Sequence, residues 1–223
     1  QADDSASVER TISDKIRGAV PQLPIDSIKP SAIKGLYEVE LANGERVFAT
    51  EDGGHFVAGD LFQVSDKGLV NLTEQSRDVA RAEKMAALDD EQLIVFSPEN
   101  KKASVSVFTD VDCGYCRKLH LEMEQYLARG IEIKYLAFPR AGIGSNSYKK
   151  IVSAWCAEDR QEAITRLKMG ETIATKDCEN PVAEHYSLGS EIGVRGTPAL
   201  VLESGQMVPG FIEPDRLAKL LGI

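Results

Sequence analysis

The spacing of apolar residues changes along the chain, and each spacing predicts a different element. In residues 3–18 apolar side chains recur at every fourth position, which predicts a short amphipathic helix. Between residues 35 and 64 apolar and polar residues alternate on both sides of Asn43-Gly44, a pattern typical of a β-hairpin. We therefore expect residues 19–64 to form a small antiparallel sheet.

The pattern changes twice more towards the C-terminus. Residues 72–92 are highly charged with few large apolar side chains, which predicts an exposed connecting helix. From residue 93 short apolar runs alternate with helical segments, so an α/β arrangement is expected. These changes divide the chain into an N-terminal domain (1–64), a linker with its helix (65–92) and an α/β domain (93–223).

Individual elements of the α/β part can be read from the same patterns. Residues 93–97 form a short apolar run, strands are expected over 103–109 and 131–138, and a hairpin is expected over 198–202 and 206–211. Helical segments are expected over 114–128, 145–169, 181–192 and 214–221.

The N-terminal sheet is expected to be only marginally stable as a domain by itself, because some 65 residues bury little core and a small sheet has exposed edges. Pairing of an edge with the same edge of a second copy would solve both problems. The alternative is an ordinary monomeric lobe packed on the rest of the chain.

Composition narrows the class of partner. The 223 residues carry a formal net charge of −9, and the sequence pI is about 5.0. This argues against a nucleic-acid partner, because binding of phosphates needs a basic face. The content of 43% hydrophobic and 27% charged residues is typical of a soluble globular protein. No apolar run approaches the roughly 18 residues of a membrane span. The first residues, QADDSASVER, do not form a signal peptide, and a start at Gln1 fits a processed, mature chain.

The strongest chemical signal is the stretch DVDCGYCRKLH, in which Gly114 and Tyr115 separate Cys113 from Cys116. A predicted strand leads into Cys113 and a predicted helix begins there, the context of a redox motif rather than a zinc knuckle. The amide groups and partial positive charge of a helix N-terminus stabilise a thiolate. We expect Cys113 to be a partly exposed nucleophile of lowered pKa, and Cys116, one turn further on, to be a shielded resolving thiol.

Charged neighbours of the motif have effects of opposite sign. Arg117 and Lys118 would add positive charge near the sulfur or lie solvated on the helix surface. Asp110 and Asp112 would oppose the pKa shift if they pointed at the sulfur.

Two other interpretations of the CGYC pair are weaker. Zinc binding requires a second close pair, but Cys156 and Cys178 lie far apart in sequence and neither belongs to a CxxC. A purely structural disulfide across so short a loop would add little stability. His55, His120 and His185 are scattered and are expected at the surface or with satisfied partners. The sequence therefore predicts neither a metal nor another cofactor.

Two further features need an interpretation. A structural disulfide between Cys156 and Cys178 is the plain interpretation, worth roughly 3 kcal/mol, and two buried free thiols are the alternative. Such a pair would favour an oxidising compartment. Gly196-Thr197-Pro198 precedes an apolar strand, where a proline is tolerated. A sharper interpretation is a cis-proline turn that presents backbone to an extended peptide.

The motifs VFTDVDCGYCRKLH, YLAFPR, AWC…C and GVRGTPALVL…G…VPGF together resemble the bacterial periplasmic disulfide isomerase family, DsbC, over essentially the whole chain. The sister branch, DsbG, is similar too but usually has CPYC and lacks the second cysteine pair. The resemblance implies a small cystatin-like N-terminal dimerisation sheet, a linker helix and a thioredoxin-like catalytic domain.

The resemblance also implies roles and partners. Cys113 is expected as nucleophile, Cys116 as partner thiol, Thr197-Pro198 as a cis-proline loop beside them, and Cys156 with Cys178 as the structural disulfide. A periplasmic homodimer would reshuffle wrong disulfides in exported proteins, bind substrates like a chaperone, and be kept reduced by a DsbD-like membrane thiol reductant.

Two other functions remain open at this point. One is a DsbG-like thiol reductase or sulfenic-acid reducer, which would work without dimerisation. The other is a holdase chaperone whose thiols are incidental.

Overall fold

The computed structural model describes residues 2–66 and 68–223, so Gln1, on which the expectation of a processed chain rests, lies outside the described residues. The chain divides into two compact units, residues 1–77 and 78–223, each with its own core. The finer division at residues 64 and 92 stays a prediction.

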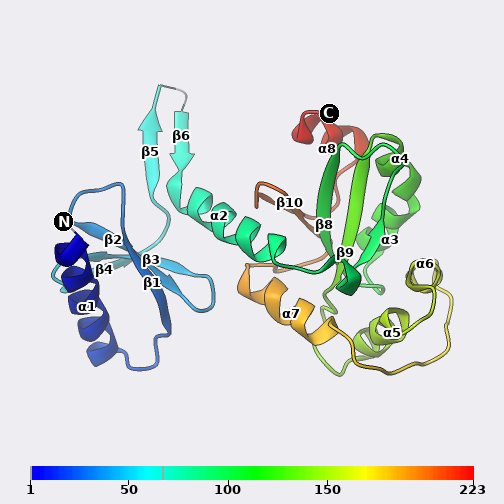
Figure 1. The fold of residues 1–223 in the computed structure, drawn as a ribbon, viewed down its shortest axis with the longest axis horizontal. Coiled ribbons are helices and arrows are strands. Elements are labelled where there is room, and N and C mark those ends of the chain that lie inside the picture. The colour runs from blue at the N-terminus through cyan, green and yellow to red at the C-terminus, as the bar shows by residue number, and fades with distance from the viewer. Residues whose placement is uncertain (1, 67) are drawn as a thin grey trace. The chain divides into compact units, whose positions relative to one another are not determined.

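The first unit is an antiparallel sheet covered by one helix (Figure 1). Its strands, in the order β1-β2-β3-β4, are β1 (Ile25–Pro30), β2 (Leu36–Leu41), β3 (Arg46–Thr50) and β4 (Phe56–Ala58). Helix α1 (Ala2–Ala19) packs Ile12 and Ile16 against Val39 and Val47 of the sheet, which confirms the predicted amphipathic helix. The hairpin between β2 and β3 is confirmed too, and the positive φ of Gly44, 78°, explains why glycine follows Asn43 there.

The sheet prediction was incomplete at its C-terminal end. A second, two-stranded sheet of β5 (Phe62–Ser65) and β6 (Gly68–Asn71) follows the four-stranded one. Helix α2 (Leu72–Ala86) then crosses from the first unit into the second. It ends six residues earlier than predicted, and a 3-10 helix (Asp90–Gln92), capped by the Asp89 side chain, takes up the remainder.

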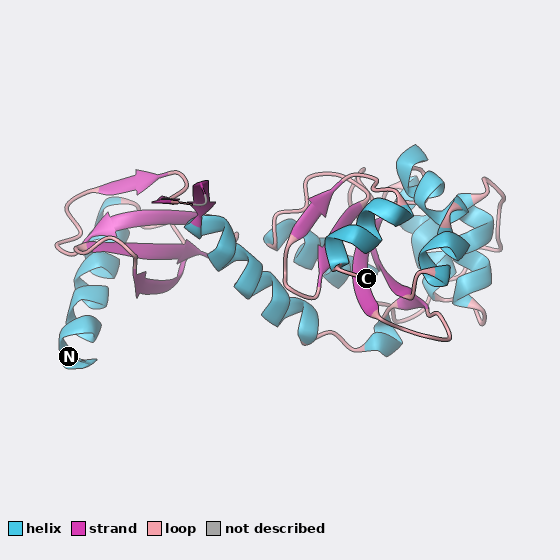
Figure 2. Ribbon diagram, turned by 90° about the horizontal axis from the view of Figure 1, so that it is seen from above, coloured by secondary structure: helices cyan, strands magenta, loops and turns pink. Residues whose placement is uncertain are grey.

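The second unit is an α/β domain with a five-stranded sheet in the order β11-β10-β8-β9-β7 (Figure 2). Its strands are β7 (Ile94–Phe96), β8 (Ala103–Thr109), β9 (Ile131–Ala137), β10 (Ala199–Leu202) and β11 (Met207–Pro209). Only β8 and β9 are parallel, and the helices α3 (Gly114–Leu121) and α4 (Met123–Ala128) connect them as a βαβ unit. The predicted small antiparallel N-terminal sheet and the α/β arrangement of the second unit are confirmed.

Alternation along the central strands supplies two separate apolar faces. Val105 and Val107 of β8 face the helices α3, α4, α5 (Asn146–Trp155), α6 (Arg160–Lys168) and α8 (Pro214–Leu221). Phe108 and Leu136 face the opposite way, towards α7 (Val182–Glu191), which Figure 1 shows on the other side of the sheet. In α7, Gly189 allows close packing, because a Cβ there would lie only 2.7 Å from Phe138.

Two predicted helices are each divided in two. The helix predicted over 114–128 is interrupted at Glu122, whose ψ of 11° departs from helical geometry. The helical region predicted over 145–169 separates into α5 and α6, because Cys156 ends one helix and the Asp159 side chain caps the next. Periodicity runs on across both breaks, so it did not reveal them.

Candidate active site around the CxxC motif

The two thiols lie at the carboxyl end of β8, where the strand turns into helix α3. Cys113 is the N-cap residue of α3, with extended φ and ψ of −89° and 122°. Val111, two residues before Cys113, is fully buried and anchors this turn in the core. The Cys113 side chain makes no capping hydrogen bond, so the free amide groups of the first helical turn act on its sulfur through their partial positive charge.

The surroundings of Cys113 favour its thiolate. A hydrogen bond from the Cys116 thiol is the main cause that lowers the pKa of Cys113, to about 5. Burial opposes this shift, whereas the Thr197 side chain, the amide of Cys116 and the charge of Arg140 add to it. A thiol with this pKa is almost entirely ionised at neutral pH and is a ready nucleophile.

The expectation that Cys113 is partly exposed was wrong, since only 3% of its surface is accessible. In the thiol form its Sγ donates to the backbone oxygen of Thr197 at 3.2 Å. The Thr197-Pro198 peptide bond is cis, and β10 starts directly after it. This contact joins positions 84 residues apart, so local sequence does not reveal the burial.

The residues between the two cysteines form the open rim of the site. Tyr115 is 64% exposed, and a Cβ placed on Gly114 would meet no atom within 4 Å. A protein substrate can therefore approach the motif from this side without displacing a side chain at position 114.

Cys116 differs from Cys113 in the direction of its pKa shift. It is 1% exposed, and burial together with its hydrogen bond to Cys113 raises its pKa far above the usual range. Both cysteines are free thiols in the structure. One sulfur is thus prepared to attack and the other is held protonated behind it.

The two acidic residues before Cys113 are neutralised by partners. Asp110 is buried, accepts from the Ser147 hydroxyl, and accepts from the Arg140 amide at 3.0 Å. Burial would raise the pKa of Asp110, but these hydrogen bonds and the one from the Asp112 amide lower it overall. Asp112 itself accepts from Lys150 at 2.8 Å.

The cation beside the Cys113 sulfur is Arg140, which sequence reasoning missed. It acts on Cys113 through its charge and pairs with Asp110, with 3.3 Å between Nε and Oδ2. Arg117 instead donates to the backbone oxygen of Val111 at 2.8 Å, and Lys118 lies over the ring of Phe211. Arg140 ends the motif YLAFPR, which contributed to the family resemblance, but no residue near it in sequence indicated that its side chain lies beside Cys113.

A second missed residue lies behind Cys116. Lys168 is 3% exposed, donates from Nζ to the Thr109 hydroxyl at 2.7 Å, and lies 4.8 Å from the ring centroid of Tyr135. Burial lowers its pKa to about 8. A lysine in the last turn of a charged helix normally lies in solvent, so its sequence position gave no signal.

The histidines do not form a metal site. His120 and His185 are buried, and burial lowers the pKa of each to about 4, whereas His55 is exposed. His120 is bonded through both ring nitrogens, to Tyr135 and to Thr165. Within residues 2–66 and 68–223 no group of three or more His, Cys, Asp or Glu side chains could hold a metal ion.

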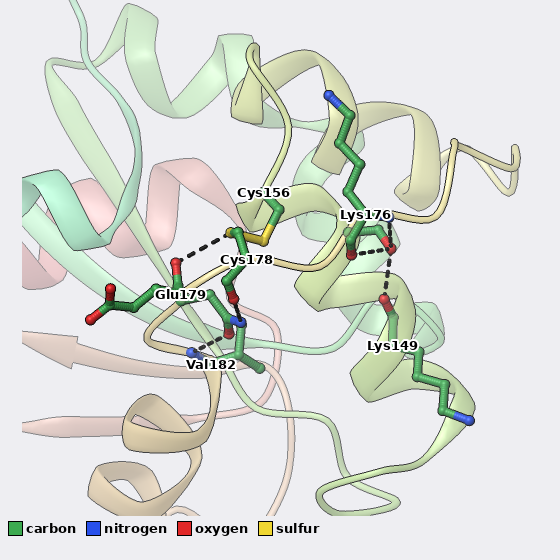
Figure 3. The surroundings of a disulfide bond; sticks show 8 residues. Lys149, Cys156, Lys176, Cys178, Glu179 and Val182 are labelled. Atoms are coloured by element: carbon green, nitrogen blue, oxygen red, sulfur yellow. Dashed lines mark hydrogen bonds between the residues drawn. A yellow bond between two sulfur atoms is a disulfide. The ribbon is translucent and has the colours of Figure 1, made fainter.

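Cys156 and Cys178 form a disulfide (Figure 3). It fastens the irregular segment 171–181 to the end of α5. Hydrogen bonds next to the disulfide also join this segment to α5. The Ser153 hydroxyl accepts from the Lys176 amide at 3.2 Å and donates to the Lys149 backbone oxygen.

Comparisons with known proteins cover both units. The family model of the disulfide bond isomerase protein N-terminal domain matches residues 1–74, and that of a thioredoxin-like domain matches residues 89–222. The thiol:disulfide interchange protein DsbC of Escherichia coli K12 is 36% identical over 99% of this chain and 88% of its own length. That of Dickeya dadantii is 38% identical over 97% of this chain and 89% of its own length.

Among solved structures, a disulfide interchange protein from Neisseria gonorrhoeae matches with a TM-score of 0.54 and 31% identity. The match covers 60% of this chain and 96% of the other. In the part of the chain that the structure describes, no helix has the length and apolar character needed to cross a membrane.

Proposed function

The chain belongs to the DsbC family of disulfide isomerases, and we propose that it reshuffles wrong disulfides in proteins with Cys113 as nucleophile and Cys116 as resolving thiol. Thiol–disulfide oxidoreductase chemistry follows from the family. The assignment of the two roles rests on one observation: Cys113 lies at the N-cap of α3, whereas Cys116 lies inside the helix and is 1% exposed. The pKa of Cys113 is lowered and that of Cys116 is raised in accordance with these positions.

The first step is attack by the Cys113 thiolate on a substrate disulfide. A bond forms between Cys113 Sγ and one substrate sulfur, the substrate S–S bond breaks, and the second substrate sulfur leaves as a thiolate. The freed thiolate attacks another disulfide of the same substrate. A substrate thiolate then attacks the mixed disulfide and releases Cys113, so no net oxidation occurs.

The second thiol acts when rearrangement stalls. Cys116 attacks Cys113 Sγ, an intramolecular disulfide forms, and the substrate leaves with one disulfide reduced. The oxidised enzyme then needs two electrons to act again. We propose a DsbD-like membrane thiol reductant as their source.

The test is the recovery of activity by a scrambled multi-disulfide protein in a mild thiol buffer. Cys113→Ser is expected to abolish the recovery. Cys116→Ser is expected to retain rearrangement but to accumulate enzyme–substrate mixed disulfides, visible by non-reducing electrophoresis. Full recovery with Cys113→Ser would exclude the assigned nucleophile.

The N-terminal unit supports a homodimer that acts on disulfide-containing proteins. We propose that the dimer forms through residues 1–64. Strand β4 is an edge of the four-stranded sheet, and its residues Phe56 and Val57 are 57% and 62% exposed. An edge of this kind is a template for pairing with a second copy.

Light scattering tests this proposal. The full chain is expected to give twice its mass of 24.3 kDa, and Val57→Lys, which places a charge on the edge strand, is expected to shift the mass towards the monomer. A mass near 24.3 kDa for the unaltered chain would exclude the dimer.

We also propose that the protein works in the periplasm. The Cys156–Cys178 disulfide supports this, because structural disulfides persist in oxidising compartments. Recovery of the endogenous protein from a periplasmic extract, with this disulfide formed, is the direct test.

Chaperone-like binding is a second candidate activity. It is favoured by exposed apolar side chains of the first unit outside the proposed pairing edge, namely Phe62, Val64 and Leu69. The variant with both Cys113 and Cys116 replaced by alanine separates the activities. It is expected to suppress aggregation of an unfolded protein while losing isomerisation.

A further inference from the structure

Beneath the resolving thiol lies a buried polar cluster that the steps above do not use. It consists of Thr109 at the end of β8, Tyr135 of β9, His120 of α3 and Lys168 of α6. Each of the four is at least nine-tenths buried. Four elements of the fold thus converge on polar side chains behind Cys116.

Lys168 is the unusual member of this cluster. A buried ammonium group is destabilising unless a carboxylate neutralises it. Among the described residues no carboxylate lies within ion-pair distance of Lys168. Its hydrogen bond goes to a neutral hydroxyl, and the nearby Asp110 is already bonded to Ser147 and Arg140. Buried lysines that shift towards the neutral form are typical of proton-transfer sites.

One hydroxyl connects this lysine to the resolving thiol. Thr109 Oγ1 lies 2.7 Å from Lys168 Nζ, and the same side chain is hydrogen-bonded to Cys116. A hydroxyl can accept from one neighbour while it donates to the other. Thr109 can therefore pass a proton from the Cys116 sulfur to the Lys168 nitrogen.

We propose that Lys168 is the proton acceptor for Cys116, acting through the hydroxyl of Thr109, when Cys116 resolves a mixed disulfide at Cys113. This rests on the proposed function, in which Cys113 attacks and Cys116 resolves. Lys168 touches no substrate atom, so it is a positioning residue for the proton of the second thiol.

The step balances as follows. Cys116 S–H gives its proton to Thr109, whose own proton passes to the neutral Lys168 amine. The Cys116 sulfur bonds to Cys113 Sγ, the bond from Cys113 to the substrate sulfur breaks, and the substrate thiolate leaves. When a dithiol reductant later opens the disulfide and is itself oxidised, Cys116 leaves as a thiolate and recovers the stored proton.

The charged groups around Lys168 change its pKa in the course of this cycle. Burial lowers the pKa of Lys168. The negative charges of Cys113 and Asp110, and that of Cys116 when it is ionised, oppose this effect, whereas Arg117 adds to it. In a mixed disulfide Cys113 carries no charge, so Lys168 loses an anion and becomes easier to deprotonate. The acceptor is thus made available at the step that requires it.

The hydrogen bonds of His120 to Thr165 and Tyr135 fix the protonation state of the His120 ring. Thr165 donates its hydroxyl proton to the Gln161 backbone oxygen, so it accepts from His120 Nε2–H. His120 Nδ1 is then an acceptor for the Tyr135 hydroxyl. His120 is therefore neutral, and Tyr135 is oriented with its ring beside Lys168 Nζ.

The experiment is a stopped-flow reaction of the reduced full-length protein with dithiobis(nitrobenzoate), an aromatic disulfide that releases one coloured thiolate at each exchange. The first release reports attack by Cys113 and the second reports resolution by Cys116. In Lys168→Met the first release is expected to remain fast. The second is expected to slow about tenfold at neutral pH, the order of effect of one nearby charge on a buried group.

The pH profile separates a proton acceptor from a merely structural lysine. In the unaltered protein the second rate is expected to level off above about pH 8, where the Cys116–Lys168 pair has lost one proton. In Lys168→Met it is expected to continue rising with pH. A second rate that is unchanged in magnitude and pH profile would overturn the proposal.

A matched pair of variants covers the relay itself. Thr109→Ser keeps the hydroxyl and is expected to preserve the second rate, whereas Thr109→Val removes it and is expected to slow that rate as Lys168→Met does. Equal rates in the two variants would overturn the relay. The exposed Lys149→Met on α5 is the control. Absence of the first release would instead indicate failure of the proposed function, so the two failures are distinguishable.

Discussion

Arg140 and Asp110 form an ion pair beside the attacking sulfur. Arg140 Nε lies 3.3 Å from Asp110 Oδ2, and the Arg140 amide donates to the same oxygen at 3.0 Å. The pair neutralises a buried carboxylate at the end of β8 and leaves the guanidinium close enough to lower the pKa of Cys113.

Replacing Arg140 with methionine is therefore expected to raise the pKa of Cys113. Arg140 is about half exposed, and water screens its charge, so alkylation by neutral iodoacetamide near pH 5 should slow less than tenfold. Near pH 8, where Cys113 is fully ionised in both proteins, the rates should agree. Arg140→Lys, which keeps the charge, is the control, and an identical alkylation profile for Arg140→Met would contradict the assigned role.

The contrast between Arg140 and Cys113 shows how far the sequence leads at this site. The strand, the CxxC spacing and the helix after it are local, so they could be predicted from residues 103–128 alone. Arg140 reaches the sulfur only because β9 lies parallel to β8 in a fixed register. Thr197 reaches it through β10, and the covering of Cys113 by that loop was missed for the same reason.

Local chemistry also decided which parts of the fold were predictable. Asn43-Gly44 predicted its hairpin because the turn requires a positive φ at Gly44. The division at Glu122 was not predictable, since apolar periodicity continues through it. Lys168 could not be found either, because burial at the end of a charged helix follows from packing of α6 on α3 and β9 rather than from its own neighbours.

Lys168 is expected to destabilise the fold at neutral pH. Its pKa is about 8 when folded and 10.5 when exposed, so between these values the unfolded chain binds more protons and the free energy of unfolding rises with pH. Below about pH 8 the full penalty applies, up to about 3 kcal/mol. Lys168→Met should therefore be more stable in urea at pH 7 by about 1–3 kcal/mol.

The difference between the two proteins is expected to shrink as the pH approaches 10.5, where the lysine is neutral in both states. Comparing differences between proteins, rather than absolute stabilities, removes the contribution of other groups that titrate there. The exposed Lys149→Met is the control and should change stability little. A less stable Lys168→Met protein at neutral pH would contradict this account.

His120 and His185 are expected to make the protein sensitive to mild acid. Burial lowers the pKa of each from 6.5 to about 4, so within that window the unfolded chain binds more protons than the folded one. The free energy of unfolding should fall as the pH drops from about 6.5 to about 4, by a few kcal/mol for the two together.

The slope of unfolding free energy against pH tests this, since a histidine variant also changes the baseline stability. Replacing both His120 and His185 with glutamine should flatten the slope, whereas His55→Gln, at an exposed position, should leave it unchanged. An equal slope in all three proteins would mean that other groups govern acid sensitivity.

The Cys156–Cys178 disulfide is expected to stabilise the second unit without entering the redox chemistry. It closes a separation of 22 residues, which corresponds to about 3 kcal/mol on the loop-entropy model. Replacing both cysteines with alanine should lower the free energy of unfolding in urea by about that amount. Because this disulfide fastens segment 171–181 and makes no contact with the CxxC sulfurs, the alkylation rate of Cys113 should stay the same.

Ser153→Ala provides the matched comparison, because it removes the neighbouring hydrogen bond from the Lys176 amide and leaves the disulfide intact. Its loss should be nearer the 1 kcal/mol of one hydrogen bond. If the two variants lost equal stability, local contacts rather than closure of the chain would account for the effect of the disulfide. If Cys113 reactivity changed as well, segment 171–181 would have to be coupled to the active site, and the separation of structural from redox cysteines would fail.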